Sequence, residues 1–266
     1  MRGTVAGKPV LMLVDTGANG HVIAGWFARK LALKLEKAGD VGVDHVGKTI
    51  EAYRVQKPQI AIDGWGAVAE TSVLAAEVPD GIEALGIGAF ISPQRLAEEG
   101  HAVVLDLRGG TLRAERWEDA ATDLLHRGAP LLTATSVRTC EEEGPDPSKG
   151  VAFVVPATVG GERVDLLLDS GAERTDLLTG SNAAKRLGKN AQKSEPVYTA
   201  SGKSAASRLA GTKLVAGKVS ATLDINLIGG ASDPACPRDG VLAMDVLRRC
   251  TVLLSSSRVA AHCAQE

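Results

Sequence analysis

One short pattern occurs twice in this chain and constrains its fold more than any other feature. Residues 14–18 read Val-Asp-Thr-Gly-Ala and residues 168–172 read Leu-Asp-Ser-Gly-Ala, each at the end of an apolar run. The two aspartates are 154 positions apart (169 − 15), and the approaches to the two triplets, from Thr4 and Thr158, keep the same spacing. One such triplet is a common way to end a strand in a turn. Two triplets with matching approaches indicate an internal repeat.

Further landmarks follow in the same order after each triplet. Leu31 is matched by Leu187, Gly47 by Gly202, and the Leu-Gly step at 85–86 by the Leu-Ala step at 242–243. Residues 141–150 are polar, contain Pro and Gly, and carry no apolar side chain, which is typical of a linker. The sequence therefore predicts a first lobe over 1–140, a linker over 141–150 and a second lobe over 151–266.

Local patterns predict several short elements. Residues 3–14 are typical of a hairpin with its turn at 6–8, and residues 46–55 of a second hairpin with its turn at 47–48. Helices are expected over 26–34, over 92–100, for which the second lobe has no counterpart, and over 182–187. The five histidines show no metal-ligand spacing and are interpreted as solvated or core residues, and Asp245 is interpreted as structural.

Composition sets the fold class and excludes some partners. Of the 266 residues, 44% are hydrophobic but only 3% are aromatic, and there are 30 glycines, which with many short β-branched runs favours an all-β fold with a few short helices. The formal net charge of −2 gives no electrostatic reason to expect a nucleic acid or an anionic membrane as partner. No apolar stretch approaches the length of a membrane span.

The paired triplets resemble those of the aspartic peptidases, and most of the chain looks like two retropepsin-like domains in tandem. The resemblance implies the acid-protease fold, with two pseudo-symmetric lobes, each a barrel of six to seven strands, around a central cleft. It also implies site residues. These are Asp15 and Asp169 as the catalytic pair, Thr16, Gly17, Ser170 and Gly171 as supports of the active-site loops, and Gly47 and Gly202 as candidate flaps. For each flap, an ordinary surface hairpin is the alternative.

The chemistry expected of such a pair is peptide-bond hydrolysis by an activated water. Two carboxylates about 3 Å apart cannot both ionise, so they hold one proton between them. One acts as base on the water while the other donates a hydrogen bond to the substrate carbonyl. The resemblance therefore implies an endopeptidase that needs no metal or other cofactor. We expect it to take an extended peptide or protein and to work as a monomer whose lobes form an internal dimer. The alternatives are a peptide-binding module that does not cut, and a structural protein in which the triplets are turns.

The cysteines and the start of the chain bear on localisation. Four cysteines allow two disulfides, which we expect to join Cys236 with Cys250 and Cys140 with Cys263; buried reduced thiols are the alternative. Together with the resemblance, this favours a secreted or periplasmic protein. A strand over 151–155 would precede the second hairpin, and its equivalent in the first lobe is missing. We therefore expect a leading strand, and any signal peptide, to have preceded Met1 in the full protein.

Overall fold

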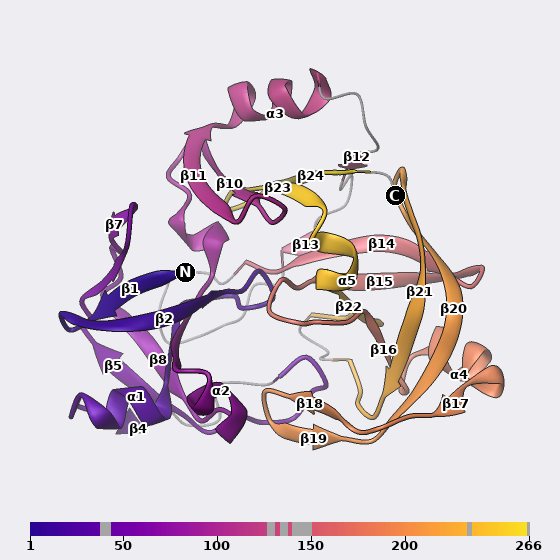
Figure 1. Cartoon of the computed structure of the whole chain (residues 1–266), viewed down its shortest axis with the longest axis horizontal. Coiled ribbons are helices and arrows are strands. Elements are labelled where there is room, and N and C mark those ends of the chain that lie inside the picture. Colours follow the sequence, from indigo (N-terminus) through magenta and orange to yellow (C-terminus); the bar gives the residue numbers. More distant parts are fainter. Residues whose placement is uncertain (38–43, 127–130, 134–137, 140–150, 233–235, 265–266) are drawn as a thin grey trace.

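The computed structural model describes residues 1–37, 44–126, 131–133, 138–139, 151–232 and 236–264. Strands dominate and the helices are few and short, as the composition predicted (Figure 1). The described strands form a nine-stranded sheet from the first part of the chain, an eight-stranded sheet from the second part, a five-stranded sheet that draws on both, and a separate two-stranded hairpin. The predicted linker over 141–150 and Cys140 lie outside the described residues.

The nine-stranded sheet, called the first sheet below, begins with a hairpin that leads to Asp15. Strands β1 and β2 pair from Arg2 opposite Leu11 to Val5 opposite Lys8, around a turn in which Gly7 has φ of 73°. Such a positive φ suits glycine, which has no Cβ to clash. The order across the sheet is β4-β5-β8-β3-β9-β2-β1-β6-β7. The bounds are β1 (Arg2–Val5), β2 (Lys8–Val14), β3 (Val22–Ala24), β4 (Glu36–Lys37), β5 (Ala52–Gln56), β6 (Ile60–Ile62), β7 (Gly66–Ala67), β8 (Ser72–Ala76) and β9 (Ile87–Ile91).

The eight-stranded second sheet repeats this path strand for strand. The series β1-β2-β9-β3-β8-β5-β4 is matched by β14-β15-β22-β16-β21-β20-β17, and the parallel pairs β2–β9 and β3–β8 are matched by the parallel pairs β15–β22 and β16–β21. An added pairing of β14 with β20 closes six of these strands into a barrel. The bounds are β13 (Arg138–Thr139), β14 (Phe153–Val159), β15 (Glu162–Leu168), β16 (Asp176–Leu178), β17 (Gln192–Lys193), β20 (Ala206–Ala216), β21 (Val219–Ile228) and β22 (Gly240–Leu242).

The first sheet also closes into a barrel, through the pairing of β6 with β1, but its long hairpin is interrupted and counts as four strands, β5 to β8. Its strands β5 and β6 correspond to the single long strand β20, because β6 pairs with β1 as the end of β20 pairs with β14. The interruption falls at residues 57–59, where Lys57 and Gln59 both have φ of 48°, a value unfavourable for residues with a side chain. The register nevertheless continues across the break, since Gln56 faces Ser72 and Ala61 faces Ala67. Both halves of the chain therefore follow one barrel plan.

Residues 153–155 are the start of β14 and continue directly into the second hairpin, where they pair with β15. The sequence suggested a separate strand over 151–155 ahead of that hairpin, and this expectation was wrong. Every second side chain of β14, from Phe153 to Val159, lies in the main core. The first residues of β14 are therefore part of the same continuous strand that forms the hairpin.

Two of the predicted helices are shorter than their sequence patterns indicated, and a third has the predicted length. The pattern over 26–34 predicted one helix, but α1 (Gly25–Lys30) ends where Ala32 takes φ of 50°. The pattern over 92–100 gives only the 3₁₀ helix η1 (Pro93–Leu96). The prediction over 182–187 is confirmed as α4 (Asn182–Leu187), whose first turn is capped by the Ser181 hydroxyl. The remaining helices are α2 (Asp80–Ala84), α3 (Trp117–His126), η2 (Gly188–Asn190) and α5 (Met244–Leu247).

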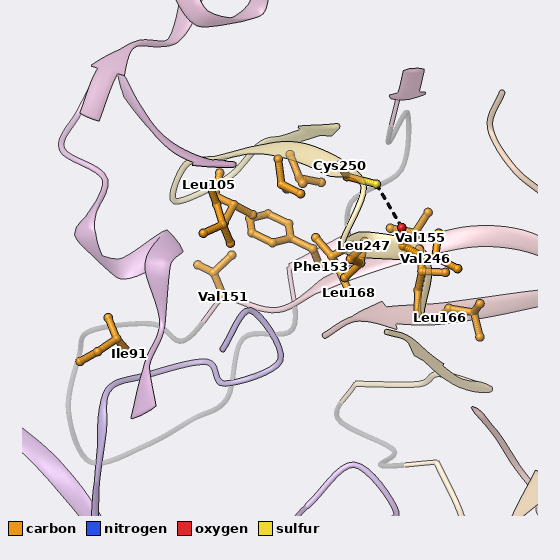
Figure 2. Packing of buried hydrophobic residues seen from close by; sticks show 14 of the residues in the cluster. Ile91, Leu105, Val151, Phe153, Val155, Leu166, Leu168, Val246, Leu247 and Cys250 are labelled. Carbon is orange, nitrogen blue, oxygen red and sulfur yellow. Dashed lines mark hydrogen bonds between the residues drawn. The ribbon is translucent and has the colours of Figure 1, made fainter. Parts of the chain in front are cut away.

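The five-stranded sheet joins the two halves of the chain. In Figure 1 it lies above the two barrels, with α3 on its outer side. Its order is β11-β10-β23-β24-β12. Alternate residues of β10 face opposite sides: Ala102 and Val104 pack with α3, while Val103 and Leu105 belong to the main core. Figure 2 shows Leu105, Val151 and Phe153 in that core beneath the sheet. The bounds are β10 (His101–Asp106), β11 (Thr111–Arg116), β12 (Leu131–Thr133), β23 (Cys250–Leu254) and β24 (Val259–Cys263).

The disulfide prediction was wrong. Cys250 is bonded to Cys263, not to Cys236, because β23 and β24 form a hairpin that sets these two cysteines directly opposite each other, with Cα atoms 4.0 Å apart. Cys236 is also disulfide-bonded, so no cysteine among the described residues is free. Sequence spacing alone could not choose the pairing, because the hairpin register decides it. Within the described part of the chain, no helix has the length and apolar character needed to cross a membrane.

Candidate active site

Each triplet aspartate directly follows a strand, β2 or β15, and lies beside the end of a parallel neighbouring strand. The backbone N–H of Asp15 donates to the carbonyl of Ile91 at 2.9 Å, and that of Asp169 donates to the carbonyl of Leu242 at 3.0 Å. Side chains at the carboxyl ends of adjacent parallel strands meet at one edge of a sheet. The two aspartates are thus presented in equivalent ways by the two repeats.

This geometry corrects one landmark of the repeat. The step at 242–243 is matched by Ile91 and Ser92, not by Leu85 and Gly86, because β2 pairs with β9 so that Val14 faces Ile91. In the second sheet, Leu168 faces Leu242 in the same way. Each step then leads into a short helix, η1 or α5, so the second half does have a counterpart of η1.

The two aspartate loops are interlocked by the hydroxyls of Thr16 and Ser170. The Thr16 hydroxyl donates to the carbonyl of Leu168 at 2.8 Å and accepts from the Ser170 N–H at 2.9 Å. The Ser170 hydroxyl donates to the carbonyl of Val14 at 2.8 Å and accepts from the Thr16 N–H at 3.1 Å. These four reciprocal hydrogen bonds are buried or partly buried, and they fix the two loops relative to each other.

The carboxyl groups lie at the centre of this arrangement. Asp15 Oδ1 accepts from the N–H groups of Gly17 and Ala18 at 2.9 and 3.1 Å, and Asp169 Oδ1 accepts from the two equivalent N–H groups of its own loop at 2.8 and 3.0 Å. Each carboxyl also lies against the glycine of the other loop. A Cβ built on Gly17 would be 2.6 Å from Asp169 Cγ, and one built on Gly171 would be 2.7 Å from Asp15 Cγ. Only glycine leaves the room that this approach needs.

The pair has the electrostatics of two acids that compete for one proton. Burial raises the pKa of Asp15 to about 8, and the charge of Asp169 and a hydrogen bond with its side chain act in the same direction, against the two backbone N–H groups. A carboxylic acid normally loses its proton near pH 4. Two interacting acids titrate as a unit, so the shift belongs to the pair.

Two buried side chains hold the strand that follows each aspartate loop, and sequence reasoning missed both. His21 Nδ1 accepts from the Ser92 N–H at 3.1 Å, and at the equivalent place the Thr175 hydroxyl accepts from the Ala243 N–H at 3.2 Å. Burial, and then the nearby positive charge of Arg95, lower the pKa of His21 to about 4. The ring is therefore neutral at neutral pH and acts as a structural acceptor.

The short helices that follow β9 and β22 add a second support. From η1, the Gln94 side chain donates to the carbonyls of Thr16, Ala18 and Val151 at 3.2, 2.8 and 2.8 Å. Near the equivalent position in α5, the Asp245 carboxylate accepts from the Thr175 N–H at 2.8 Å. The sequence indicated only a structural role for Asp245, which agrees with this contact.

The two candidate flap glycines lie in turns. Gly202, with φ of 111°, follows the turn of a hairpin made by β18 (Val197–Thr199) and β19 (Gly202–Ser204). Gly47, with φ of 81°, lies in a turn over residues 44–48, which is called the first tip below. The sequence predicted a hairpin over 46–55, but only β5 forms in this range. The first tip and the hairpin meet, because Ser201 donates through its hydroxyl to Asp44 Oδ2 at 2.5 Å.

One further pair lies beside the aspartates and was not predicted. His45, on the first tip, has its Nε2 atom 3.4 Å from Oδ2 of Asp176, at the start of β16. Burial has the largest effect on each pKa, lowering that of His45 and raising that of Asp176. The charge of Asp169 raises both pKa values, so all three groups interact. The histidines were interpreted as scattered solvated or core residues. The position of His45, two residues before a candidate flap glycine, could have singled it out.

A family model described as "Aspartyl protease" matches residues 1–88 and 155–246. Many solved structures are also similar to parts of this chain, and two of them are given as examples. A retropepsin-like aspartic protease from Rickettsia conorii is 19% identical, with 44% of this chain and 86% of that chain covered and a TM-score of 0.32. EIAV protease in complex with the inhibitor HBY-793 is 11% identical, with 35% and 83% covered and a TM-score of 0.26. A search of curated proteins found no match.

A repeated β-barrel plan that presents two Asp-Thr/Ser-Gly loops to each other defines the class of the aspartic peptidases. The family model covers both repeats and both triplets, which is more than half of the chain. This chain belongs to the aspartyl protease family.

Proposed function

We propose that this protein is an aspartic endopeptidase in which Asp15 and Asp169 together activate a water molecule. The observation that carries the proposal is the set of reciprocal hydrogen bonds between the two aspartate loops, called the grip below. Thr16 and Ser170 each bond across to the other loop, and each carboxyl lies against the opposite glycine. A pair of turns that served structure alone would not require carboxyl groups to be brought together, since this raises their free energy.

In the proposed mechanism the pair holds a single proton. The ionised carboxylate takes a proton from the attacking water, and the protonated one donates a hydrogen bond to the carbonyl oxygen of the scissile bond. The water oxygen adds to the carbonyl carbon, and the tetrahedral intermediate then collapses as a proton passes to the leaving nitrogen. The backbone N–H groups on each Oδ1 atom orient the carboxyls for both steps. The pair works as a unit, so neither residue is assigned the proton.

The substrate in this proposal is an extended segment of peptide or protein. An extended chain gains affinity by adding backbone hydrogen bonds, as an additional strand does. The first tip and the β18–β19 hairpin would cover it and exclude water. Because one chain carries both aspartates, a monomer is sufficient, with the two repeats acting as an internal dimer over 1–140 and 151–266.

The test compares wild type with Asp15→Asn and Asp169→Asn on a mixed peptide pool from acidic to neutral pH, with cleavage products read by mass spectrometry. Asp63→Asn is the matched control, because Asp63 is an exposed aspartate at the end of β6. We expect cleavage by wild type and the control, and none by either dyad variant. Peptide binding without turnover in wild type would instead support a binding module, and cleavage that survives both dyad substitutions would refute the proposed mechanism.

A further inference from the structure

The first tip crosses from the first sheet to the second and is held there by several contacts. The carbonyl of Val46 accepts from the Ala231 N–H at 3.3 Å, and Lys48 Nζ donates to the Ser204 hydroxyl at 3.2 Å. A Cβ on Gly47 would lie 2.7 Å from the Ala231 carbonyl oxygen. Val46 itself is buried in a small cluster with Leu178 and Ile228. The tip is therefore seated on the second sheet.

The side chains of β16 show which face receives the tip. Leu177 belongs to the main core, whereas Leu178 packs with Val46. Because side chains alternate along a strand, Asp176 points to the same face as Leu178, away from the barrel interior. There it meets His45, and the two side chains are only 17% and 5% exposed. Asp176 Oδ1 has no hydrogen-bond partner among the described residues, and His45 and the backbone of Val241 are the groups that favour the charged carboxylate.

The internal repeat provides a control for the role of this pair. Asp176 begins β16, and the equivalent first residue of β3 is Val22. The same barrel position therefore accepts an apolar side chain. A buried ion pair is seldom more stable than the apolar packing that could replace it. The charge at Asp176 is thus explained by its contact with the tip and not by the needs of the barrel.

We infer that His45 and Asp176 form a latch that holds the first tip closed over the two aspartates, with His45 acting as a positioning residue. The inference rests on the proposed function, since it gives the latch a substrate to enclose. An extended peptide can reach the aspartates only when the tip moves aside. Closing it again re-forms the ion pair and excludes water from the site. The latch differs from the Asp44–Ser201 contact because both of its partners titrate.

The charged groups around the pair set the pH range in which it holds. Burial lowers the pKa of His45, but the hydrogen bond and charge of Asp176, together with the charges of Asp169 and Asp44, outweigh this and raise it. Burial raises the pKa of Asp176. Lys48, on the same tip, bonds to Ser204. Closure is then favoured below the raised pKa of His45 and above the raised pKa of Asp176, and weakens as pH leaves this window on either side.

The experiment measures the latch both with and without catalysis. Variants His45→Gln, Asp176→Asn and Asp176→Val are compared with Arg208→Gln, which removes an exposed 3.3 Å ion pair to Asp224 on the same sheet. By NMR we follow the pKa of the His45 ring and the exchange rate of the Ala231 amide, which bonds to the tip. Latch variants should exchange Ala231 roughly tenfold faster and raise KM by a similar factor, with a smaller change in kcat. The His45 pKa should fall in both Asp176 variants.

The outcomes separate the latch from the proposed function. If Asp15→Asn abolishes cleavage but the latch variants match the control in Ala231 exchange, KM and pH profile, the latch is wrong and the proposed function stands. If wild type cleaves nothing, the exchange rate and the His45 titration still decide whether the latch exists. Asp176→Val guards against a folding defect, because Val22 shows that the barrel accepts this side chain. A latch variant that melts like wild type and exchanges Ala231 at the wild-type rate would overturn the inference.

Discussion

Replacing Gly17 with alanine should strongly lower the rate of peptide cleavage while leaving most of the fold intact. The added Cβ would lie 2.6 Å from Asp169 Cγ and 2.8 and 2.9 Å from its two carboxyl oxygens. Ordinary contact begins near 3.4 Å, so the carboxyl must move by about 0.8 Å (3.4 − 2.6). The Asp169 carboxyl cannot retreat freely, because two backbone N–H groups hold its Oδ1.

The expected magnitude follows from that displacement. A misplacement of about 1 Å at a reacting group can cost about 10²-fold in rate, and overpacking a tight site costs about 1–3 kcal/mol of stability. We therefore expect kcat to fall by about 10²-fold and the free energy of unfolding by about 1–3 kcal/mol in Gly17→Ala. Gly171→Ala, with its Cβ 2.7 Å from Asp15 Cγ, should behave alike.

Steady-state peptide cleavage and urea unfolding measure the two effects. The matched control is Gly20→Ala, on the same loop, where an added Cβ meets nothing within 4 Å. If Gly17→Ala and Gly20→Ala retain equal kcat values, the close approach of the two aspartate loops described here is wrong.

Three further predictions concern the grip, the disulfide and pH. Thr16→Val removes the hydroxyl that serves both Leu168 and Ser170, and should lower the urea-unfolding free energy by about 1–3 kcal/mol; an unchanged midpoint would contradict the grip. The double variant Cys250→Ser/Cys263→Ser opens a link between residues 13 apart and should cost about 3 kcal/mol in thermal unfolding, with no loss if the bond is dispensable. Because the pKa of Asp15 is raised to about 8, kcat/KM should persist to neutral pH and fall as pH rises through about 8; a basic limb below pH 6 would refute this.

The sequence was enough to predict the repeat and the two aspartate loops, because a turn that ends a buried strand leaves a local pattern. The hairpin leading to Asp15 and the helix α4 were also correct, since both depend on neighbouring residues. The match of Leu85 with Leu242 failed because a short apolar step resembles many others, and only the strand register shows that Ile91 is the counterpart of Leu242.

Contacts between distant segments could not be predicted. Cys250 faces Cys263 because of a hairpin register that no spacing rule supplies. The pairing of His45 with Asp176 depends on how the first tip sits on the second sheet. Both are tertiary features, and a single sequence carries little information on which of many distant partners will meet.

The five-stranded sheet has a consequence for synthesis of the chain. Strand β10 pairs with β23, and Asp106 and its partner Thr251 are separated by 145 residues (251 − 106). At about 5–20 residues per second, a ribosome needs roughly 7–30 s to make the missing partner. During that interval one side of a very apolar strand, which includes Val103, Val104 and Leu105, has free N–H and C=O groups. A nascent first half is therefore a template for mispairing with other chains until the last strands emerge.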